Sequence, residues 1–191
     1  MARQQVLGKA AIGSEALMWK AALVLGGSLL VAIAAQITVP FFPVPMTLQM
    51  LAVLVVGAAL GFRLGSLALL AYVAEGLMGL PVFSKGGAGL AHLFGPSGGY
   101  ITGFVLAAAV AGWVADRGWS QRLLTLIPGL ALASIVLYIP GLLQLKVLSG
   151  ADWGQVWAWG AGPFLLGDSV KIVLAALIVT GGWSALRARK R

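Results

Sequence analysis

Long uncharged apolar segments are the feature that most constrains the fold of this chain. Of its 191 residues, 60% are hydrophobic and 9% are charged, and the mean hydropathy is +0.99. A soluble core of this size could not bury so much apolar surface, whereas a helix of about 20 apolar residues crosses a bilayer. We therefore predict an all-α integral membrane protein with six transmembrane helices. The expected spans are 21–39, 47–62, 64–80, 98–115, 123–148 and 162–183.

Two regions contain residues that turn or bend a helix. The spans 47–62 and 64–80 are separated only by Arg63, which predicts a tight helical hairpin. Pro128 and Pro140 lie inside the fifth span. Because proline lacks a backbone N–H, we expect kinks or an early end there.

Length and composition exclude several functional classes. We expect residues 1–191 to form one six-helix domain with a short cytoplasmic segment 1–16 and a basic tail 184–191, which leaves no room for a soluble enzyme or nucleotide-binding module. With no cysteine and one histidine, neither a disulfide nor a metal site is expected. The net charge of +8 does not indicate nucleic-acid binding, because the basic residues stand at the ends of apolar segments. We expect no enzymatic activity and no cofactor.

Most basic residues fall on one side of the predicted spans, and only Lys85 and Lys146 fall on the other. The positive-inside rule then predicts cytoplasmic termini in a multi-pass protein of the inner (cytoplasmic) membrane, surrounded by membrane lipid. The external connections are 40–46, 81–96 and 149–161. The residues assigned to the cytoplasmic side are Arg3, Lys9, Lys20, Arg63, Arg117, Arg122, Arg187, Arg189, Lys190 and Arg191.

An alternative for the start of the chain is a signal peptide, since Ala32-Ile33-Ala34 resembles a cleavage site. The basic region before it would be unusually long, and cleavage would leave five spans with a poorer charge balance. We therefore expect the first span to be retained.

Asp168 and Lys171 stand three residues apart inside the last apolar span. A charge at membrane depth costs roughly 2.5–3.5 kcal/mol on insertion scales, so such residues usually face the bundle interior or a ligand path. Their spacing places both on one helix face. We expect them to bind a ligand from the outer half of the helix. The alternative is a structural ion pair that holds helices together.

Two external connections have unusual compositions. In residues 39–49 three prolines hold the chain extended, so this strip could lie across a cavity mouth or form a stiff interfacial turn with aromatic anchors. Dense glycines in residues 79–100 would let the backbone approach a ligand. Pro96-Ser97 predicts a helix start whose N–H groups could bind an anion. The alternative is a mobile loop whose small residues only permit packing.

Four motifs follow one another along the chain. They are Val-Pro-x-x-Pro-Val-Pro-x-Thr-x-Gln at 39–49, Gly-Leu-Pro-Val-Phe at 79–83, Gly-Pro-Ser-Gly-Gly-Tyr at 95–100 and Gly-Asp-x-x-Lys at 167–171. Together they resemble the BioY-type biotin-binding S components of energy-coupling factor (ECF) transporters. The resemblance implies a six-helix subunit that captures biotin from outside with high affinity. It also implies partners, namely a transmembrane coupling subunit and two ABC ATPases.

Biotin suits the residues already singled out. Its ureido ring presents a carbonyl acceptor and two N–H donors, which Lys171 and Asp168 match. Its thiophane ring and valeryl chain need an apolar slot, which Phe41, Phe83 and Tyr100 could form. The full set of expected substrate-binding residues is Asp168, Lys171, Phe41, Thr47, Gln49, Phe83, Lys85, Gly86, Gly87, His92, Ser97, Gly98, Gly99 and Tyr100.

The partner of biotin's carboxylate stays open at this point. Many family members have a polar residue where this chain has Gly87 or Ala88, and some have a basic residue where Ile101 stands. The remaining candidates are Lys85, His92, Ser97 and the amides of Gly98 and Gly99. Lys85 could equally be a topology charge and His92 an interfacial polar residue.

Two other functions compete with this one. Gly95-Pro96-Ser97-Gly98 fits the Gly-x-Ser-Gly pattern of intramembrane serine proteases, but His92 lies in the same loop rather than on a separate helix. A stand-alone carrier or channel for a small solute is the other alternative. It is disfavoured because no trail of polar groups continues through the cytoplasmic half.

Overall fold

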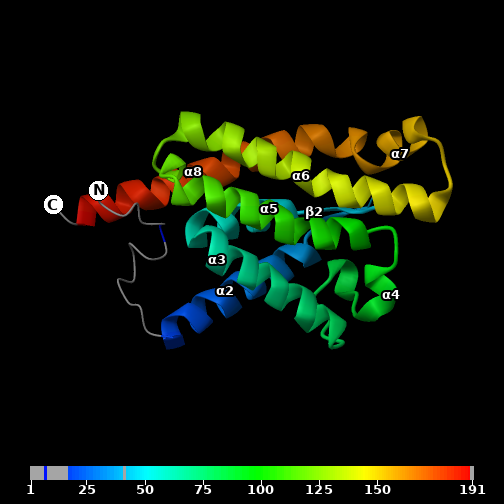
Figure 1. The fold of residues 1–191 in the computed structure, drawn as a ribbon, viewed down its shortest axis with the longest axis horizontal. Helices are drawn as coiled ribbons and strands as arrows, with labels where there is room; N and C mark the ends of the chain where they lie inside the picture. Colours follow the sequence, from blue (N-terminus) through cyan, green and yellow to red (C-terminus); the bar gives the residue numbers. More distant parts are fainter. Residues whose placement is uncertain (1–6, 8–16, 41, 190–191) are drawn as a thin grey trace.

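The computed structural model describes residues 7, 17–40 and 42–189 and shows an almost entirely helical chain (Figure 1). Five helical segments among these residues are long and apolar enough to cross a membrane, so the predicted all-α class is confirmed. The long helices are α2 (Leu17–Gln36), α3 (Gln49–Leu77), α5 (Gly98–Asp116), α6 (Leu123–Ser149) and α8 (Leu165–Arg189). The shorter elements are β1 (Thr38–Val39), β2 (Met46–Thr47), η1 (Ser84–Gly86), α4 (Gly89–Leu93), η2 (Trp119–Gln121), α7 (Trp153–Gly160) and η3 (Gly162–Phe164).

The chain reverses inside α3, at Gly61. The φ of 82° and ψ of 176° at this residue are non-helical and suit a residue without a side chain. The two halves of α3 pack against each other, since a Cβ added at Gly65 would come 2.9 Å from the Cα of Gly57. The N–H of Phe62, which the break leaves without a helical acceptor, donates to the carboxylate of Asp116 at 3.1 Å. The halves thus form the helical hairpin expected between the second and third spans.

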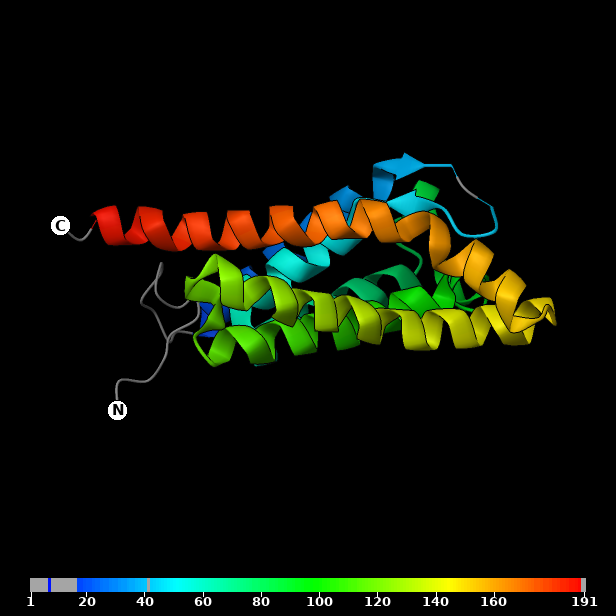
Figure 2. The same ribbon diagram turned by 90° about the horizontal axis from the view of Figure 1, so that it is seen from above.

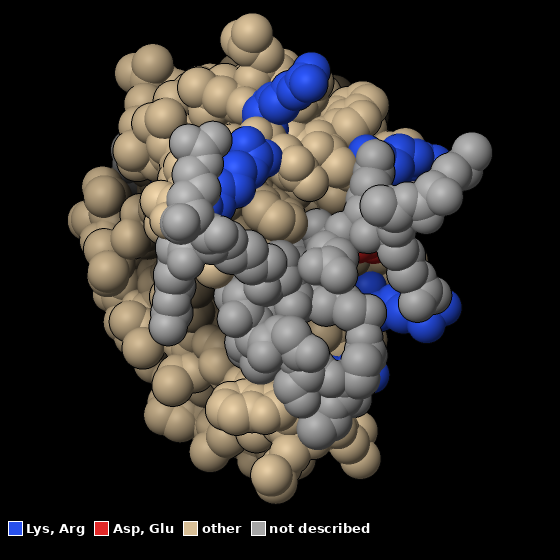
Figure 3. Space-filling view, turned by 90° about the vertical axis from the view of Figure 1, so that its left-hand side faces the viewer, with Lys and Arg blue, Asp and Glu red and all other residues tan. Residues whose placement is uncertain are grey.

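Different elements lie at the two ends of the molecule. The start of α2 and the end of α8 lie at one end, whereas α4, α7 and β2 lie at the other (Figures 1 and 2). Several Lys and Arg side chains lie on the surface of the first end (Figure 3). Positive charge is therefore present at the end of the molecule where α2 begins and α8 ends.

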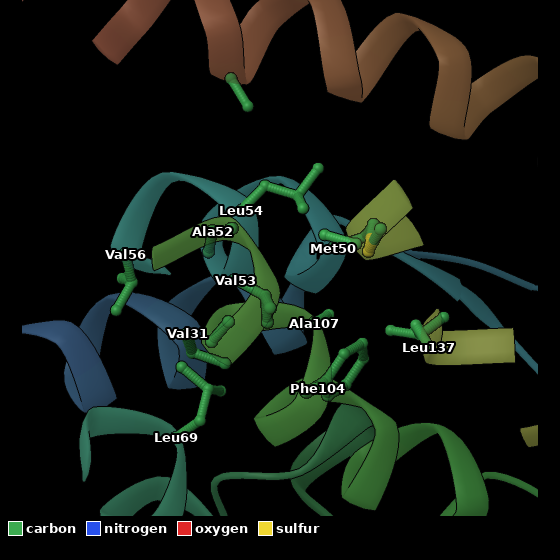
Figure 4. Packing of buried hydrophobic residues seen from close by; sticks show 14 of the residues in the cluster. Val31, Met50, Ala52, Val53, Leu54, Val56, Leu69, Phe104, Ala107 and Leu137 are labelled. Carbon is green, nitrogen blue, oxygen red and sulfur yellow. The ribbon is translucent and has the colours of Figure 1, made fainter. Parts of the chain in front are cut away.

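Close packing around α3 and α5 forms the core. Val31 of α2 and Leu69 of α3 point toward one another and are fully buried (Figure 4). Small residues bring the helix backbones together, as a Cβ at Gly57 would come 2.6 Å from the carbonyl oxygen of Ala108 on α5. This is the packing typical of membrane helices, in which apolar side chains gain nothing by leaving lipid and close contact supplies the attraction.

α6 continues through both of its prolines. The helix runs without interruption from Leu123 to Ser149, with Pro128 and Pro140 inside it, so the alternative of an early end is wrong. α5 lies very close to this helix, because a Cβ at Gly103 would come 2.6 Å from the carbonyl oxygen of Leu137. Neighbouring helices that pack this closely can hold a helix together where proline removes a hydrogen bond.

Candidate functional site

A pocket lies toward the end of the molecule that carries α4, α7 and β2. Its walls come from the connection before α3, from the first two turns of α3, α5 and α8, from the middle of α6, from η3, and from two serines outside the long helices. The lining residues are Val44, Pro45, Met46, Thr47, Gln49, Met50, Ser84, Ser97, Tyr100, Ile101, Phe104, Leu137, Tyr138, Phe164, Asp168 and Lys171. Most of this lining is apolar, with a few polar groups, as in typical small-molecule sites.

The charged pair of the last helix faces this pocket. Lys171 Nζ lies 2.9 Å from Asp168 Oδ1, and both residues are more than nine-tenths buried. One helical turn separates them, as the spacing predicts. Because both charges belong to α8, their ion pair does not join two helices. A link to a second helix comes instead through Asp168, which accepts a hydrogen bond from Tyr138 on α6.

Tyr138 supplies a second donor to Asp168. Its hydroxyl donates to Oδ2 at 2.6 Å, so each carboxylate oxygen accepts one hydrogen bond from the protein. The ring of Tyr138 lies edge-on to that of Tyr100, with 6.2 Å between centroids. The Tyr100 hydroxyl in turn donates to the carbonyl of Gly160 at 2.8 Å. The two tyrosines thus connect α5, α6, α7 and α8 around the pocket.

Thr47 and Gln49 line the pocket as part of a hydrogen-bonded network. The Thr47 hydroxyl donates to Gln49 Oε1 at 2.9 Å and accepts from the Gln49 N–H at 3.2 Å. Gln49 Nε2 donates to the hydroxyl of Tyr72 at 2.7 Å, and this hydroxyl donates to the carbonyl of Val82 at 3.2 Å. The network joins the start of α3 to the loop that follows its end, and it fixes both pocket residues.

Phe83, Gly87 and His92 pack against one another and are not among the residues that line the pocket. The ring of Phe83 is fully buried, edge-on to Tyr72 at 5.5 Å and stacked on His92 at 5.2 Å. A Cβ at Gly87 would come 2.3 Å from His92 Nδ1, so glycine lets the imidazole lie against the loop. Burial lowers the pKa of His92, which keeps the ring neutral at pH 7.

The other residues expected at the site are also placed outside the lining. Lys85 is exposed, and the N–H of Gly86 donates to Gln36 Oε1 at 3.0 Å. Gly98 and Gly99 pack closely against neighbouring backbone, where a Cβ would come 1.5 Å and 2.2 Å from carbonyl oxygens of Leu93 and Pro140. These glycines allow the start of α5 to approach α4 and α6. The predicted residue Phe41 lies outside the described residues.

Sequence reasoning missed several lining residues. Among them, Tyr138 is the residue that donates a hydrogen bond to Asp168. A signal existed, because a tyrosine in the middle of an apolar span lies away from the interface where tyrosines usually anchor. Ser84 gave a weaker signal as one polar residue of a glycine-rich loop. The apolar lining residues missed are Val44, Pro45, Met46, Met50, Ile101, Phe104, Leu137 and Phe164.

Comparisons with known proteins agree on one family. Residues 8–188 match the BioY family. The chain is 39% identical over 149 residues to the probable biotin transporter BioY of Pyrococcus horikoshii, covering 78% of this chain and 86% of that protein. It is 37% identical over 163 residues to the biotin transporter BioY of Thermotoga maritima, covering 84% and 90%. It also resembles the crystal structure of the S-component for biotin from an ECF-type ABC transporter, with a TM-score of 0.77, 25% identity and coverage of 91% and 92%.

Proposed function

Because the chain belongs to the BioY family, we propose that it binds biotin and takes it up across the membrane as the S component of an ECF-type ABC transporter. It is a multi-pass membrane protein, and its family consists of transporters and not of enzymes. The protease alternative therefore falls away. Within the described residues, His92 Nε2 has no hydrogen-bond partner, so it is not a base bonded to Ser97.

One observation carries the proposal: the buried group of Asp168, Lys171 and Tyr138 faces a largely apolar pocket. The ureido ring of biotin offers N–H donors to the carboxylate and a carbonyl acceptor to the ammonium. The pocket's aromatic and aliphatic side chains suit the thiophane ring and the valeryl chain. The ureido ring would then supply hydrogen bonds to the carboxylate of Asp168 and the ammonium of Lys171, both of which are buried away from water.

We infer that the chain crosses the cytoplasmic membrane six times, with the two halves of α3 as separate crossings and both termini in the cytoplasm. Gly61 supports this topology, since it reverses the chain between two apolar halves. The charge asymmetry supports it too, because Arg63 follows this turn, Arg117 follows α5 and Arg122 precedes α6. The pocket would then open toward the outside. We infer one domain over residues 1–191.

A transmembrane coupling subunit and two ABC ATPases are the partners that we propose for energised transport. The similarity to an S-component that belongs to an ECF-type ABC transporter supports these partners. The competing possibility is transport by this chain alone. Biotin uptake by cells that produce the chain with and without a coupling subunit and its ATPases separates the two, and the proposal expects sustained uptake only with them.

Direct binding tests the proposed ligand. The purified protein in detergent should bind labelled biotin in a 1:1 ratio. Desthiobiotin retains the ureido ring and should compete strongly, whereas lipoate and thiamine, which lack it, should compete weakly. Equal competition by lipoate would contradict recognition of the ureido group.

A further inference from the structure

Two hydroxyls that line the pocket have no partner in the protein. Apart from the Asp168 group, the polar side chains of the lining are Thr47, Gln49, Ser84 and Ser97. Thr47 and Gln49 bond to each other, and Gln49 also bonds to a buried tyrosine. Across the described part of the chain, the side chains of Ser84 and Ser97 make no hydrogen bond. Both hydroxyls are therefore free to bind a ligand.

Ser84 is nine-tenths buried, with 7% of its surface exposed. Buried hydroxyls in proteins almost always have a hydrogen-bond partner, so one that lines a pocket is a candidate for ligand binding. The backbone around it is fixed, because its carbonyl accepts from the N–H of Gly87 at 3.1 Å and the preceding Phe83 is fully buried. Ser84 is thus held at the pocket wall.

Ser97 stands at the start of α5, which is 19 residues long. Its carbonyl accepts from the N–H groups of Tyr100 and Ile101, each at 3.1 Å, so the residue is locked into the first turn. The amino end of a helix carries a partial positive charge, which favours an anionic group nearby. The N–H of Gly98 donates to the carbonyl of Gly95 at 3.0 Å, and Ser97 itself lines the pocket.

Charges elsewhere restrict where an anionic ligand group can bind. Asp168 repels a second carboxylate. Lys171 bonds to Asp168 at 2.9 Å and is assigned to the ureido carbonyl in the proposed function. Lys171 is the one cationic residue among the described residues that line the pocket. Lys85 and His92 lie outside the lining. Neutral donors are therefore the groups left for a ligand carboxylate.

We propose that the hydroxyls of Ser84 and Ser97 form an uncharged subsite that donates two hydrogen bonds to the carboxylate of the ligand's side chain. This inference rests on the proposed function, since it takes that carboxylate to be biotin's. Hydrogen bonds from hydroxyls to a carboxylate are short and strong, and more so in a pocket shielded from water. The subsite selects an anionic tail without a second buried cation.

The test compares biotin with an analogue whose side chain ends in a butyl group and lacks the carboxylate. Isothermal titration calorimetry on the purified protein gives Kd for both ligands, with the unmodified chain, Ser84→Ala, Ser97→Ala and the double variant. We expect the double variant to bind biotin at least about tenfold more weakly. Its affinity for the analogue should change by less than about twofold, which also reports that the pocket is folded. Ser97→Thr retains a hydroxyl and should retain biotin affinity.

Ser66→Ala is the matched control, because the Ser66 hydroxyl is also buried and unpartnered but lies outside the pocket. It should leave both affinities unchanged. Equal losses for the two ligands in the double variant, or no loss for biotin, would overturn the subsite. Failure of the unmodified protein to bind biotin would overturn the proposed function, and the subsite with it.

Discussion

Tyr138 on α6 donates its hydroxyl hydrogen to Oδ2 of Asp168 on α8, with 2.6 Å between the two oxygens. The other carboxylate oxygen accepts from Lys171 at 2.9 Å. Two donors fix the plane of the carboxylate, while each oxygen keeps a lone pair for a ligand N–H. The contact between these helices thus sets the direction of the acceptor that a ligand meets.

Tyr138→Phe should weaken biotin binding about tenfold or more. The substitution keeps the ring, and with it the edge-on contact with Tyr100, but removes the donor to Asp168. A hydrogen bond to a charged group contributes roughly 1.5–3 kcal/mol, and 1.4 kcal/mol corresponds to a tenfold change in Kd. Calorimetric titration measures the effect. An unchanged Kd would show that Asp168 is oriented without this hydroxyl.

Lys171→Met should lower both stability and affinity, because it leaves the buried carboxylate of Asp168 without its cation. Removal of one partner of a buried ion pair costs roughly 3–5 kcal/mol, and the remaining bond from Tyr138 places this case at the lower end. The double variant Lys171→Met, Asp168→Asn should recover the midpoint temperature of unfolding in detergent but not biotin binding. Recovery of binding in the double variant would contradict a ligand role for the pair.

Gly160→Ala should disturb the pocket through Tyr100. A Cβ at Gly160 would come 2.5 Å from the Tyr100 hydroxyl, so the tyrosine must shift, and overpacking of this kind costs about 1–3 kcal/mol. Thermal unfolding should show a lower midpoint, together with weaker biotin binding. Gly181→Ala is the control, since nothing lies within 4 Å of the added Cβ. Equal midpoints for the two variants would contradict the close contact at Gly160.

Single cysteines test the proposed topology, because the chain has none of its own. Arg63→Cys lies beside the turn inside α3 and Lys85→Cys lies in η1, and both positions are exposed. A membrane-impermeant maleimide added to intact cells should label the cysteine at 85 alone. Both should react after permeabilisation. Labelling of the cysteine at 63 in intact cells would place this turn outside the cell and contradict the proposed topology.

The sequence located the charged pair because it is unusual inside an apolar span, and it located Tyr100 through the motif at 95–100. An acid and an amine within an apolar span usually face the bundle interior or a cavity. The spacing of Asp168 and Lys171 puts both on the same helix face. The apolar wall was not predictable in this way. Leu137 and Phe104 look the same in sequence whether they face lipid or a pocket, and only the packing of α5 against α6 decides between the two.

Glycines limited the prediction of the fold in a similar way. The chain has 27 of them, so composition does not single out Gly61 as the residue that reverses α3. In the loop before α5, glycine density predicted backbone close to a ligand, but Gly87 makes room for the imidazole of His92. We expected Phe83 to form part of the apolar slot for the ligand. Its ring instead packs between Tyr72 and His92, both of which it contacts.

The most direct test of biotin recognition by the charged pair is the Kd of Asp168→Asn for biotin, with Asp152→Asn as the matched control. Asp152 caps α7 through the N–H of Gln155 and lies outside the pocket, and asparagine retains that cap. We expect Asp168→Asn to stay folded in the membrane and to bind biotin at least about a hundredfold more weakly, as for a buried charged partner of the ligand. Asp152→Asn should bind as the unmodified protein does. Equal affinity of both variants would contradict recognition of biotin by Asp168.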